Sequence, residues 1–227
     1  MASPTVTVLL PAHDEAASIA QVIAGCRDHT PGLLEIVVVD DGSRDGTAAI
    51  ARRAGARVLR LGCNRGKGAA VAYAMPHLRG EVIVLLDADG QDDPAEIPLL
   101  LAALGDDVAL VIGSRFLGEF RPGAISAVNR LGTQVIDGLF NLAFSARVSD
   151  TQAGFRALRR ETMASLKIQA RHYDIETDML CQIVARGGKV VEVPVTRSIR
   201  SGGSTDFSRV RDGLRIVRRI ALTRLRG

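Results

Sequence analysis

The sequence predicts an α/β fold with a mostly parallel central sheet flanked by helices. Short continuous runs of apolar and β-branched residues, rather than alternating ones, are typical of strands buried on both faces. These runs alternate along the chain with segments of helical periodicity, which favours parallel strands joined by helical crossovers. The 227 residues, of which 47% are hydrophobic and 24% charged, suffice for a core that needs no disulfides.

The expected strands stop at residues that turn or terminate a strand. The six runs are Val6–Leu10, Ile36–Val39, Arg57–Leu61, Val82–Leu86, Val108–Ile112 and Val190–Val195. The fifth run is followed by Gly113, and we expect the last strand to end at Pro194. Because right-handed crossovers bring the carboxyl ends of parallel strands to one edge of the sheet, the residues that follow these runs should meet there.

Helical periodicity accounts for most of the chain between these runs. The expected helices are Glu15–Arg27, Thr47–Ala54, Gly68–Met75, Pro94–Leu104, Ala124–Phe144, His172–Arg186 and Phe207–Leu225. Pro94 is typical of a first helical turn, because its missing N–H would have no helical partner there. We expect Val148–Arg156 to be a loop or a short strand, and Ser201–Ser204 to be a loop.

Charge is divided unevenly along the chain. The net charge is +4, but Arg197–Gly227 holds nine Arg and two Asp, a net of +7, whereas residues 1–196 sum to −3. Such a basic end predicts phosphate groups or a membrane surface as partners. Nucleic acid is not an expected partner, because Trp is absent and only 4% of residues are aromatic, too few for base-stacking modules.

The sequence also bears on where the protein works. No apolar run approaches the ~18 residues of a membrane span, and Met1–Leu10 lacks the features of a signal peptide. Cys26, Cys63 and Cys181 form no zinc pattern and leave one thiol over in any disulfide scheme, which favours a reducing compartment. We therefore expect a cytoplasmic protein.

Asp87, Asp89 and Gln91 follow the fourth expected strand and form the most informative segment. Alternate residues leaving a strand point the same way, so these side chains can converge on one point. Two carboxylates and an amide oxygen suit Mg²⁺ or Mn²⁺, with coordination positions left open for a diphosphate. An isolated Asp-x-Asp is more often only an acidic turn, but the carboxylates that follow other strands favour the metal site.

Other binding candidates follow the first three strands. Asp41 can accept hydrogen bonds from a base or a ribose, while capping accounts for the rest of its turn. Asn64–Gly68 places Lys67 at a helix start, a position that favours phosphate, although the spacing is not that of the ATP-binding P-loop. Taken alone, His13 is equally well explained as a loop histidine without a binding role. Glu15 is equally well explained as an acid that stabilises a helix N-terminus.

Together, these segments resemble the family 2 glycosyltransferases, which use nucleotide-diphospho-sugars and have the GT-A (Rossmann-like) fold. The resemblance is closer to the branch that makes polyprenyl-phosphate or dolichyl-phosphate sugars. The matching stretches, which stand in the family's order, are LLPAHDEA, IVVVDDGSRDGT, NRGKGAAVAYAM, VIVLLDADGQDDP, VIGSRF, SDTQAGFRALRRE, KVVEVPV and RSGGST. Eight motifs in order are far more specific than any one of them.

The resemblance assigns donor-binding roles to the first half of the chain. The residues that match the base and ribose site are Pro11, His13, Glu15, Val39 and Asp41. Those that match the diphosphate and metal site are Asp87, Ala88, Asp89 and Gln91, and Lys67 lies in another matching stretch. The family usually has Tyr where this chain has His13.

The resemblance implies that the second half meets the acceptor. Arg115 should reach the phosphates at the reaction centre, and Arg130 matches the arginine that binds the acceptor phosphate. With Asp89, these two arginines are the catalytic candidates. The residues that match the sugar and acceptor site are Asp150, Gln152 and Gly154–Arg156. Those that match the mobile loop over the nucleotide are Arg200 to Ser204, followed by Thr205 where the family often has Lys.

The resemblance therefore predicts metal-dependent transfer of a hexose, with inversion, from GDP-mannose or UDP-glucose to a polyprenyl or dolichyl phosphate at the cytoplasmic membrane face. A soluble family 2 glycosyltransferase with a non-lipid acceptor is the alternative, because it shares the donor site. A nucleotidyltransferase is disfavoured, since Pro11–Glu15 is not the Gly-rich basic loop expected after its first strand.

We expect one glycosyltransferase domain over residues 1–205, with a donor half to about residue 115 and an acceptor half over 116–205, then a basic amphipathic helix over 206–227. The apolar stripe expected on that helix comprises Val210, Leu214, Val217, Ile220, Ala221 and Leu225. The helix either lies on anionic lipid or packs on the domain with its Arg residues solvated. A peripheral membrane surface is thus an expected partner, and a membrane-protein partner or a homodimer stays open.

Overall fold

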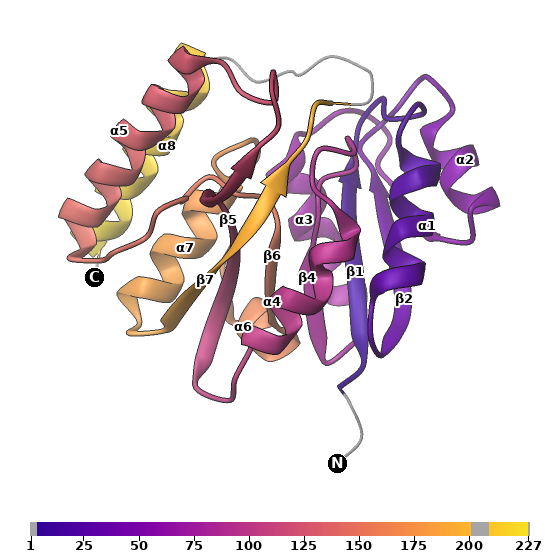
Figure 1. Ribbon diagram of the computed structural model, residues 1–227, viewed down its shortest axis with the longest axis horizontal. Coiled ribbons are helices and arrows are strands. Elements are labelled where there is room, and N and C mark those ends of the chain that lie inside the picture. The colour runs from indigo at the N-terminus through magenta and orange to yellow at the C-terminus, as the bar shows by residue number, and fades with distance from the viewer. Residues whose placement is uncertain (1–3, 201–208, 227) are drawn as a thin grey trace.

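Seven strands form one sheet in the described part of the chain, which comprises residues 4–200 and 209–226 of a computed structural model. The strands are β1 (Val6–Ala12), β2 (Leu33–Asp40), β3 (Arg57–Arg60), β4 (Val82–Leu85), β5 (Val108–Phe120), β6 (Arg156–Arg159) and β7 (Lys189–Arg197). The helices are α1 (Ile19–His29), α2 (Thr47–Arg53), α3 (Lys67–Ala74), α4 (Ile97–Ala103), α5 (Ala127–Phe144), α6 (Arg160–Ser165), α7 (Ile175–Ala185) and α8 (Arg209–Arg226), with 3-10 turns η1 (Met75–His77) and η2 (Pro94–Glu96). Figure 1 shows this arrangement, which confirms the predicted α/β fold with flanking helices and a C-terminal helix.

The sheet is parallel except around one short strand. Its order is β3-β2-β1-β4-β6-β5-β7, and β6 runs antiparallel to both β4 and β5. The loop or short strand predicted over Val148–Arg156 overlaps β6 only at Arg156, so neither this strand nor its antiparallel pairing was predicted. Its four residues begin and end with Arg, so they show neither the apolar run nor the alternation that marks a strand.

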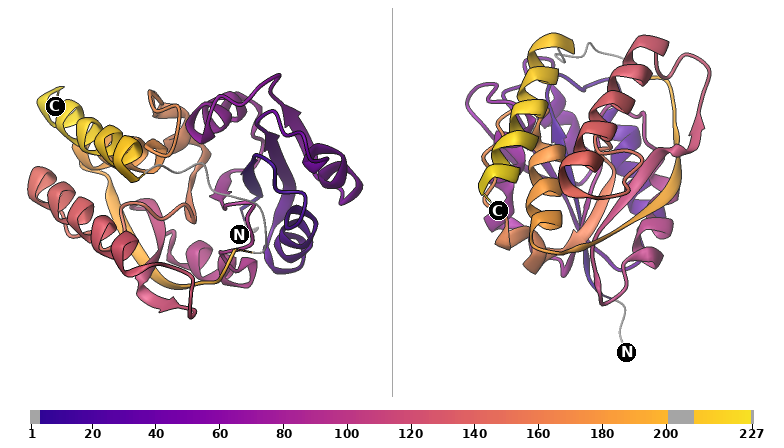
Figure 2. Two further views of the ribbon diagram at one scale, coloured as in Figure 1. Left: turned by 90° about the horizontal axis from the view of Figure 1, so that it is seen from above. Right: turned by 90° about the vertical axis from the view of Figure 1, so that its left-hand side faces the viewer.

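Helices cover both faces of the sheet, so the strands are buried on two sides (Figure 2). Within β1, Leu9 joins one core cluster, while Val8 and Leu10 join the other. The first cluster includes apolar residues of α3, α7 and α8, and the second includes those of α1 and α4. This two-sided burial explains why the strands read as continuous apolar runs.

Two strands continue past the ends predicted for them. The prediction that the fifth strand stops at Gly113 is wrong, because β5 runs on to Phe120 beside β7. Glycine permits this approach: a Cβ at Gly118 would lie only 2.1 Å from the backbone oxygen of Val195. β7 likewise passes through Pro194, which an edge strand tolerates because one of its sides is unpaired.

The strand order places a crevice beside β1. From β1 the chain adds β2 and β3 on one side, and then returns to add β4 on the other side. Crossover connections leave in opposite directions at such a point, so the carboxyl ends of β1 and β4 border an open crevice where ligands bind in α/β sheets.

The C-terminal helix α8 packs beside α5 and α7 (Figures 1 and 2). Its buried face comprises Asp212, Ile216 and Ile220, whereas Leu214 and Leu225 are exposed. The predicted single apolar stripe is therefore wrong, because its members divide between a packed face and an outer one, and the side chain of Val210 lies outside the described residues. Among the residues described, no helix is both long enough and apolar enough to cross a bilayer.

Candidate functional site

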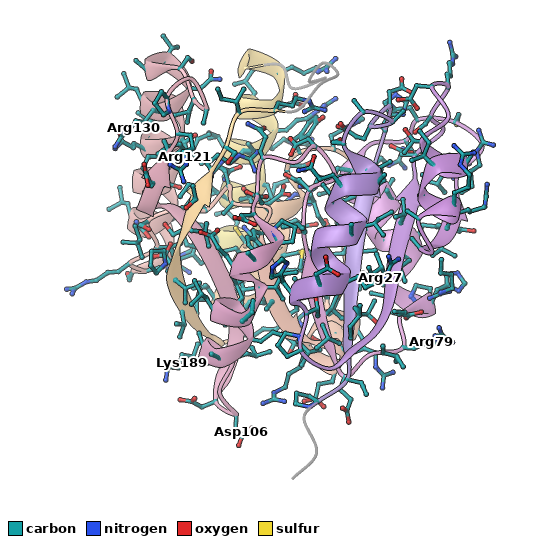
Figure 3. The ribbon with its side chains drawn as sticks, turned by 45° about the vertical axis from the view of Figure 1, so that its right-hand side comes forward. Arg27, Arg79, Asp106, Arg121, Arg130 and Lys189 are labelled. Atoms are coloured by element: carbon teal, nitrogen blue, oxygen red, sulfur yellow. The ribbon has the colours of Figure 1, made fainter. Side chains whose placement is uncertain are left out.

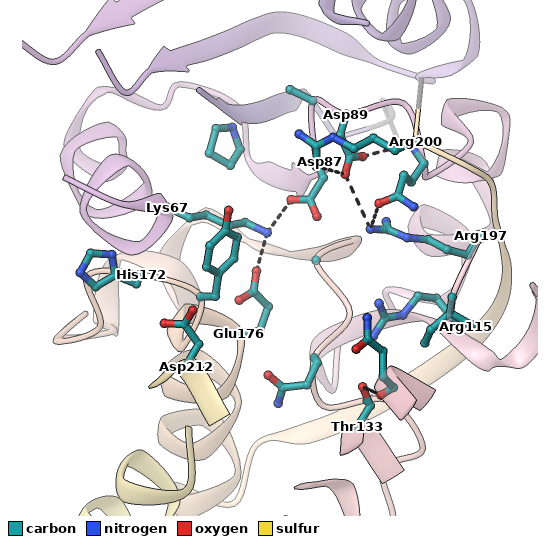
Figure 4. A pocket seen from close by; sticks show the side chains of 18 of the residues that line it. Lys67, Asp87, Asp89, Arg115, Thr133, His172, Glu176, Arg197, Arg200 and Asp212 are labelled. Atoms are coloured by element: carbon teal, nitrogen blue, oxygen red, sulfur yellow. Dashed lines mark hydrogen bonds and ion pairs between the residues drawn. The ribbon is translucent and has the colours of Figure 1, made fainter. Parts of the chain in front are cut away.

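A pocket of about 970 Å³ opens at the carboxyl ends of β1, β2 and β4 and extends to α5 and α8 (Figure 4). The predicted site residues that line it are Pro11, His13, Glu15, Asp41, Lys67, Asp87, Ala88, Asp89, Gln91, Arg115, Gln152, Gly154 and Arg200. The other predicted residues in the described part of the chain are not among the lining residues; they are Val39, Arg130, Asp150, Phe155 and Arg156. Ser204 lies outside the described residues.

Asp87, at the end of β4, is held by a buried lysine. Lys67 Nζ lies 2.5 Å from Asp87 Oδ1 and 2.5 Å from Glu176 Oε1 on α7 (Figure 4). Burial alone would raise the pKa of Asp87, but Lys67 and Arg197 bring it below its ordinary value. Burial would lower the pKa of Lys67, but Asp87 and Glu176 raise it. The lysine is therefore charged and keeps Asp87 ionised.

Asp89 lies beside two arginines: Arg197, the last residue of β7, and Arg200, in the segment that follows β7. Its Oδ2 is 3.8 Å from Arg197 Nη2 and 3.3 Å from Arg200 Nη1, and Arg200 also contacts Glu15. The pKa of Asp89 is raised, first by burial and then by the charges of Asp87 and Asp92, although Arg197 opposes this. Burial likewise raises the pKa of Glu15 to about 7 against the effect of Arg200.

Arg197 connects the acidic segment to β7. Its Nη1 lies 2.5 Å from Asp92 Oδ1, and its Nη2 donates to Gln91 Oε1 at 2.9 Å. Gln91 Nε2 in turn donates to the backbone oxygen of Ser198 at 3.0 Å. The amide oxygen of Gln91 thus already accepts one hydrogen bond, and its role as a metal ligand stays a prediction.

The loops after β1 and β3 are joined through Asp41. Its two carboxylate oxygens accept hydrogen bonds from the backbone N–H groups of Arg65 and Gly66, at 2.8 and 2.7 Å. His13 Nδ1 lies 2.8 Å from the backbone oxygen of Asp41. Asp41 therefore shapes the Lys67 loop while facing the pocket, whereas the side chain of Val39 is buried in the core.

Arg115 is fixed by a buried carboxylate. Its Nε and Nη2 each donate to Asp150 at 2.7 Å, and its backbone N–H donates to the same carboxylate at 3.0 Å. Asp150 is fully buried and does not line the pocket, so it positions Arg115, which does. A two-pronged pair of this kind sets the plane of the guanidinium.

Arg156 also supports the pocket from inside the protein. It is fully buried and donates to the backbone oxygens of Ala153, Thr151 and Glu176, at 2.8, 2.8 and 2.6 Å. These bonds hold the 151–154 loop against the start of α7. Gly154 in that loop has no room for a side chain, because a Cβ would lie 2.8 Å from Asp87 Oδ2.

Arg130 lies apart from these groups on the outer side of α5 (Figure 3). Its guanidinium carbon stands 5.5 Å from the ring centroid of Phe120 and 5.8 Å from that of Phe116. Phe120 lines the pocket, so Arg130 is separated from it by one ring. The acceptor-binding role given to Arg130 stays a prediction.

A comparison with protein families decides what kind of protein this pocket belongs to. A model for the family described as "Glycosyl transferase family 2" matches residues 7–166, which is most of the chain. The chain belongs to glycosyltransferase family 2. It is therefore a glycosyltransferase, as the motifs after β1, β2 and β4 indicated.

Two curated family 2 relatives extend this likeness. Glycosyltransferase AglJ of Haloferax volcanii is 35% identical over 92% of this chain and 68% of its own length. A dolichol-phosphate mannosyltransferase of Pyrococcus furiosus is 30% identical over 88% of this chain. The chain spans only 58% of that enzyme.

A solved structure confirms the GT-A fold. Glucosyl-3-phosphoglycerate synthase of Mycobacterium tuberculosis, in complex with Mn²⁺, UDP and glucosyl-3-phosphoglycerate, has a TM-score of 0.74 and 25% identity to this chain. The likeness covers 97% of this chain and 80% of the synthase.

The acidic pair of this glycosyltransferase suits a hard divalent cation. Asp87 and Asp89 offer carboxylate oxygens, and their mutual repulsion is offset by Lys67, Arg197 and Arg200. Within the described ranges, no group of three or more His, Cys, Asp or Glu side chains is arranged for a metal. The protein's own carboxylates thus fit a cation that takes its remaining oxygens from a diphosphate.

Two pocket residues of this family 2 enzyme were missed by the sequence analysis. Arg197 was placed beyond the predicted strand end at Pro194, so its register beside Phe120 could not be seen. Glu176 stands near the start of a predicted helix, where an acid is ordinary. Only the fold brings α7 against the Lys67 loop and so gives Glu176 a partner.

Proposed function

We propose that this chain transfers a hexose, with inversion, from a nucleotide-diphospho-sugar to a polyprenyl or dolichyl phosphate, with Mg²⁺ or Mn²⁺. The observation that carries the proposal is that the acidic pair Asp87 and Asp89 shares its pocket with several cationic side chains. Asp87 and Asp89 stand among Lys67, Arg115, Arg197 and Arg200, within reach of a donor and an acceptor that are both anionic. The donor half is residues 1 to about 115, and the acceptor half follows it.

The chemistry that this arrangement supports is a direct displacement. An oxygen of the acceptor phosphate attacks the anomeric carbon from the face opposite the diphosphate, which leaves with the bonding electrons. Because the second pKa of a phosphate monoester is about 6, the acceptor is largely ionised near neutral pH and needs no strong base. Asp87 and Asp89 would hold a divalent cation, which would supply positive charge to offset that of the departing diphosphate.

The cationic side chains bring two anions together. Arg115, held in plane by Asp150, can neutralise phosphate charge at the reaction centre. Lys67 lies between Asp87 and Glu176. It can contact the diphosphate while it stays close to both acids. Arg200, which contacts Glu15 and Asp89, is placed to close over the nucleotide.

The lipid acceptor is supported by relatives and by two exposed helix surfaces. One relative is a dolichol-phosphate mannosyltransferase, a name that joins this family to a lipid phosphate. The exposed large apolar residues of α5 and α8 are Val128, Leu131, Val135, Leu139, Leu142, Leu214, Val217 and Leu225. Apolar side chains beside Arg residues suit a peripheral position on the cytoplasmic face of a membrane.

A transfer assay with the whole chain tests the proposal. GDP-mannose and UDP-glucose are each supplied with Mg²⁺ or Mn²⁺ and with undecaprenyl phosphate in detergent. We expect transfer from one of the donors, and its loss when EDTA removes the metal. Absence of transfer to every lipid phosphate would contradict the lipid acceptor.

Single substitutions assign the residues in the same assay. Asp89→Asn should lower the rate about a hundredfold or more, because the cation loses a charged ligand. Asp106→Asn is the matched control, since Asp106 is exposed at the opposite end of the sheet (Figure 3). Arg130→Ala tests whether this residue reaches the acceptor from beside Phe120. Full activity in Asp89→Asn would refute the site assignment.

A non-lipid acceptor is the second candidate, and one observation favours it. The glucosyl-3-phosphoglycerate synthase of similar fold was solved with a small phosphorylated acid in its product. Both candidate acceptors carry a phosphate, so the cations of this pocket serve either one. Including 3-phosphoglycerate beside undecaprenyl phosphate in the assay separates the two.

A further inference from the structure

We propose that Glu192 on β7 positions Arg115 for catalysis, although it does not line the pocket and reaches Arg115 through the segment Ser149–Asp150. This inference rests on the proposed function, because it takes Arg115 to act on phosphate at the reaction centre. It adds to that function a positioning residue to which the sequence motifs assigned no role.

The carboxylate of Glu192 holds the backbone of the segment that carries Asp150. Its Oε2 accepts from the backbone N–H of Ser149 at 2.8 Å, and its Oε1 accepts from the backbone N–H of Asp150 at 3.1 Å. The Ser149 hydroxyl also donates to Oε1, at 2.8 Å. Because hydrogen bonds to a charged acceptor are about twice as strong as neutral ones, this clamp leaves the segment little freedom to shift.

Asp150 connects the clamped segment to Arg115. Its Oδ2 accepts from the backbone N–H and from Nε of Arg115, at 3.0 and 2.7 Å, and its Oδ1 accepts from Nη2 at 2.7 Å. The side chain of Asp150 is fully buried, so it cannot adjust its place freely. A displacement of the Asp150 backbone would therefore displace the guanidinium of Arg115.

A second path leads from Glu192 to the backbone on either side of Arg115. Ser149 donates its one hydroxyl proton to Glu192, so the 2.6 Å contact between the hydroxyls of Ser114 and Ser149 uses the proton of Ser114. Ser114 Oγ in turn accepts from the backbone N–H of Leu117 at 3.3 Å. These hydrogen bonds all point toward Glu192, and bonds aligned in this way strengthen one another.

The register of β5 and β7 explains why Glu192 can serve both paths. Glu192 pairs with Ile112 on β5, two residues before Ser114, and alternate residues of a strand point to the same face. Glu192 and Ser114 are therefore on one face of the sheet, where Ser149 contacts both. Glu192 is the one charged residue in Val190–Val195, and a charge in a partly buried strand is unfavourable unless it is paired.

A double-mutant cycle separates the positioning of Arg115 from a general effect on the fold. Hexose transfer is measured with the whole chain for Glu192→Gln, for Arg115→Ala and for the two together. Glutamine offers one acceptor oxygen where glutamate uses two, so one N–H of the segment loses its partner. Glu161→Gln is the matched control, because Glu161 is exposed on α6 and does not line the pocket.

We expect Glu192→Gln to lower kcat about tenfold or more, and by a larger factor than it changes KM for the nucleotide-sugar, because misplacing a group that acts in the transition state costs rate more than binding. In the Arg115→Ala background the same substitution should cost less than about twofold, because no guanidinium remains to be positioned. Equal losses in both backgrounds would overturn the proposal. Should Glu192→Gln fail to fold, Ser149→Ala replaces it in the cycle with the same expectation.

A measurement without substrates keeps this inference distinct from the proposed function. The Nε–H of Arg115 is bonded to a buried carboxylate, so its ¹⁵N NMR signal, assigned by its loss in Arg115→Lys, should exchange slowly with water. We expect Glu192→Gln to speed this exchange about tenfold or more, and Glu161→Gln to leave it unchanged. Unchanged exchange in Glu192→Gln would overturn the positioning role. If the native chain transfers no hexose to any acceptor, the proposed function fails, and this exchange still decides whether Glu192 holds Arg115.

Discussion

At the scale of single residues, this site is built from buried charges that need one another. Lys67 touches Asp87 and Glu176, and Arg197 touches Asp92 while lying near Asp89. Removing one member of such a set leaves an uncompensated buried charge, which costs about 3–5 kcal/mol. The acids that follow β4 are therefore held in place by cations from other parts of the sequence.

Asp137 on α5 is a buried carboxylate behind the acceptor side of the pocket. Its Oδ1 accepts hydrogen bonds from the backbone N–H and the hydroxyl of Thr151, at 2.9 and 2.7 Å. Its Oδ2 has no partner among the described residues. Burial raises the pKa of Asp137 to about 6, with a further rise from Asp150 and an opposing effect of Thr151.

This raised pKa predicts a pH-dependent loss of stability. Because the folded pKa lies above the unfolded value of 3.8, the contribution of Asp137 to stability is fully present below about pH 4 and falls as the pH rises through 6. Asp137→Asn keeps a neutral group at every pH. The advantage of the native residue over Asn should therefore shrink by about 1–3 kcal/mol between pH 4 and pH 7.5.

Urea unfolding of both proteins across that pH range measures the difference. Asp106→Asn, at an exposed position, is the control and should show no such trend. Curves for Asp137→Asn and the native chain that stay parallel from pH 4 to pH 7.5 would mean that Asp137 is ionised throughout.

At the scale of elements, the sequence predicted the side of the site that follows buried strands. Asp41, Asp87 and Asp89 come after continuous apolar runs, and parallel strands with one-handed crossovers must bring such ends together. The other side depended on information that no local pattern carries. Arg197 lies beyond a proline that looked like a strand end, and β6 is too short and too basic to look like a strand.

The helix α8 shows the same limit, because amphipathicity does not say which face is covered. Its sequence allows several apolar stripes, and packing on α5 and α7 buries Ile216 and Ile220 rather than Leu214. Ile216 is 1% exposed, whereas Leu214 is 67% exposed. Two positions on one helix therefore make a matched pair for testing how α8 is seated.

Ile216→Ala should lower the free energy of unfolding by about 2–4 kcal/mol, because it leaves a cavity beneath the helix. Leu214→Ala should change it by less than about 0.5 kcal/mol, because that side chain is already in solvent. Urea unfolding monitored by circular dichroism compares the two. Equal effects, or a larger effect at Leu214, would show that α8 rests on a different face.

At the scale of the whole molecule, the basic end of the sequence supplies charge to the acidic body. Arg197 and Arg200 reach the acids around β1 and β4, and Arg219 Nη2 lies 3.1 Å from Asp174 Oδ2. Part of the +7 charge is thus neutralised within the fold. Arg218 and Arg224 stay exposed on α8, so a smaller basic surface than the sequence suggested faces outward.

That outer surface predicts binding to anionic vesicles. Leu142 on α5 and Leu225 on α8 are 81% and 84% exposed, on helices that lie side by side. We expect the chain to sediment with phosphatidylglycerol vesicles, and less so as salt screens the arginines. Replacing both leucines with Asn should weaken this binding about tenfold, because two apolar side chains leave the lipid.

Leu34→Asn with Leu99→Asn is the control, since those leucines are 48% and 49% exposed on β2 and α4. Equal binding by the two double variants would contradict a membrane contact through α5 and α8.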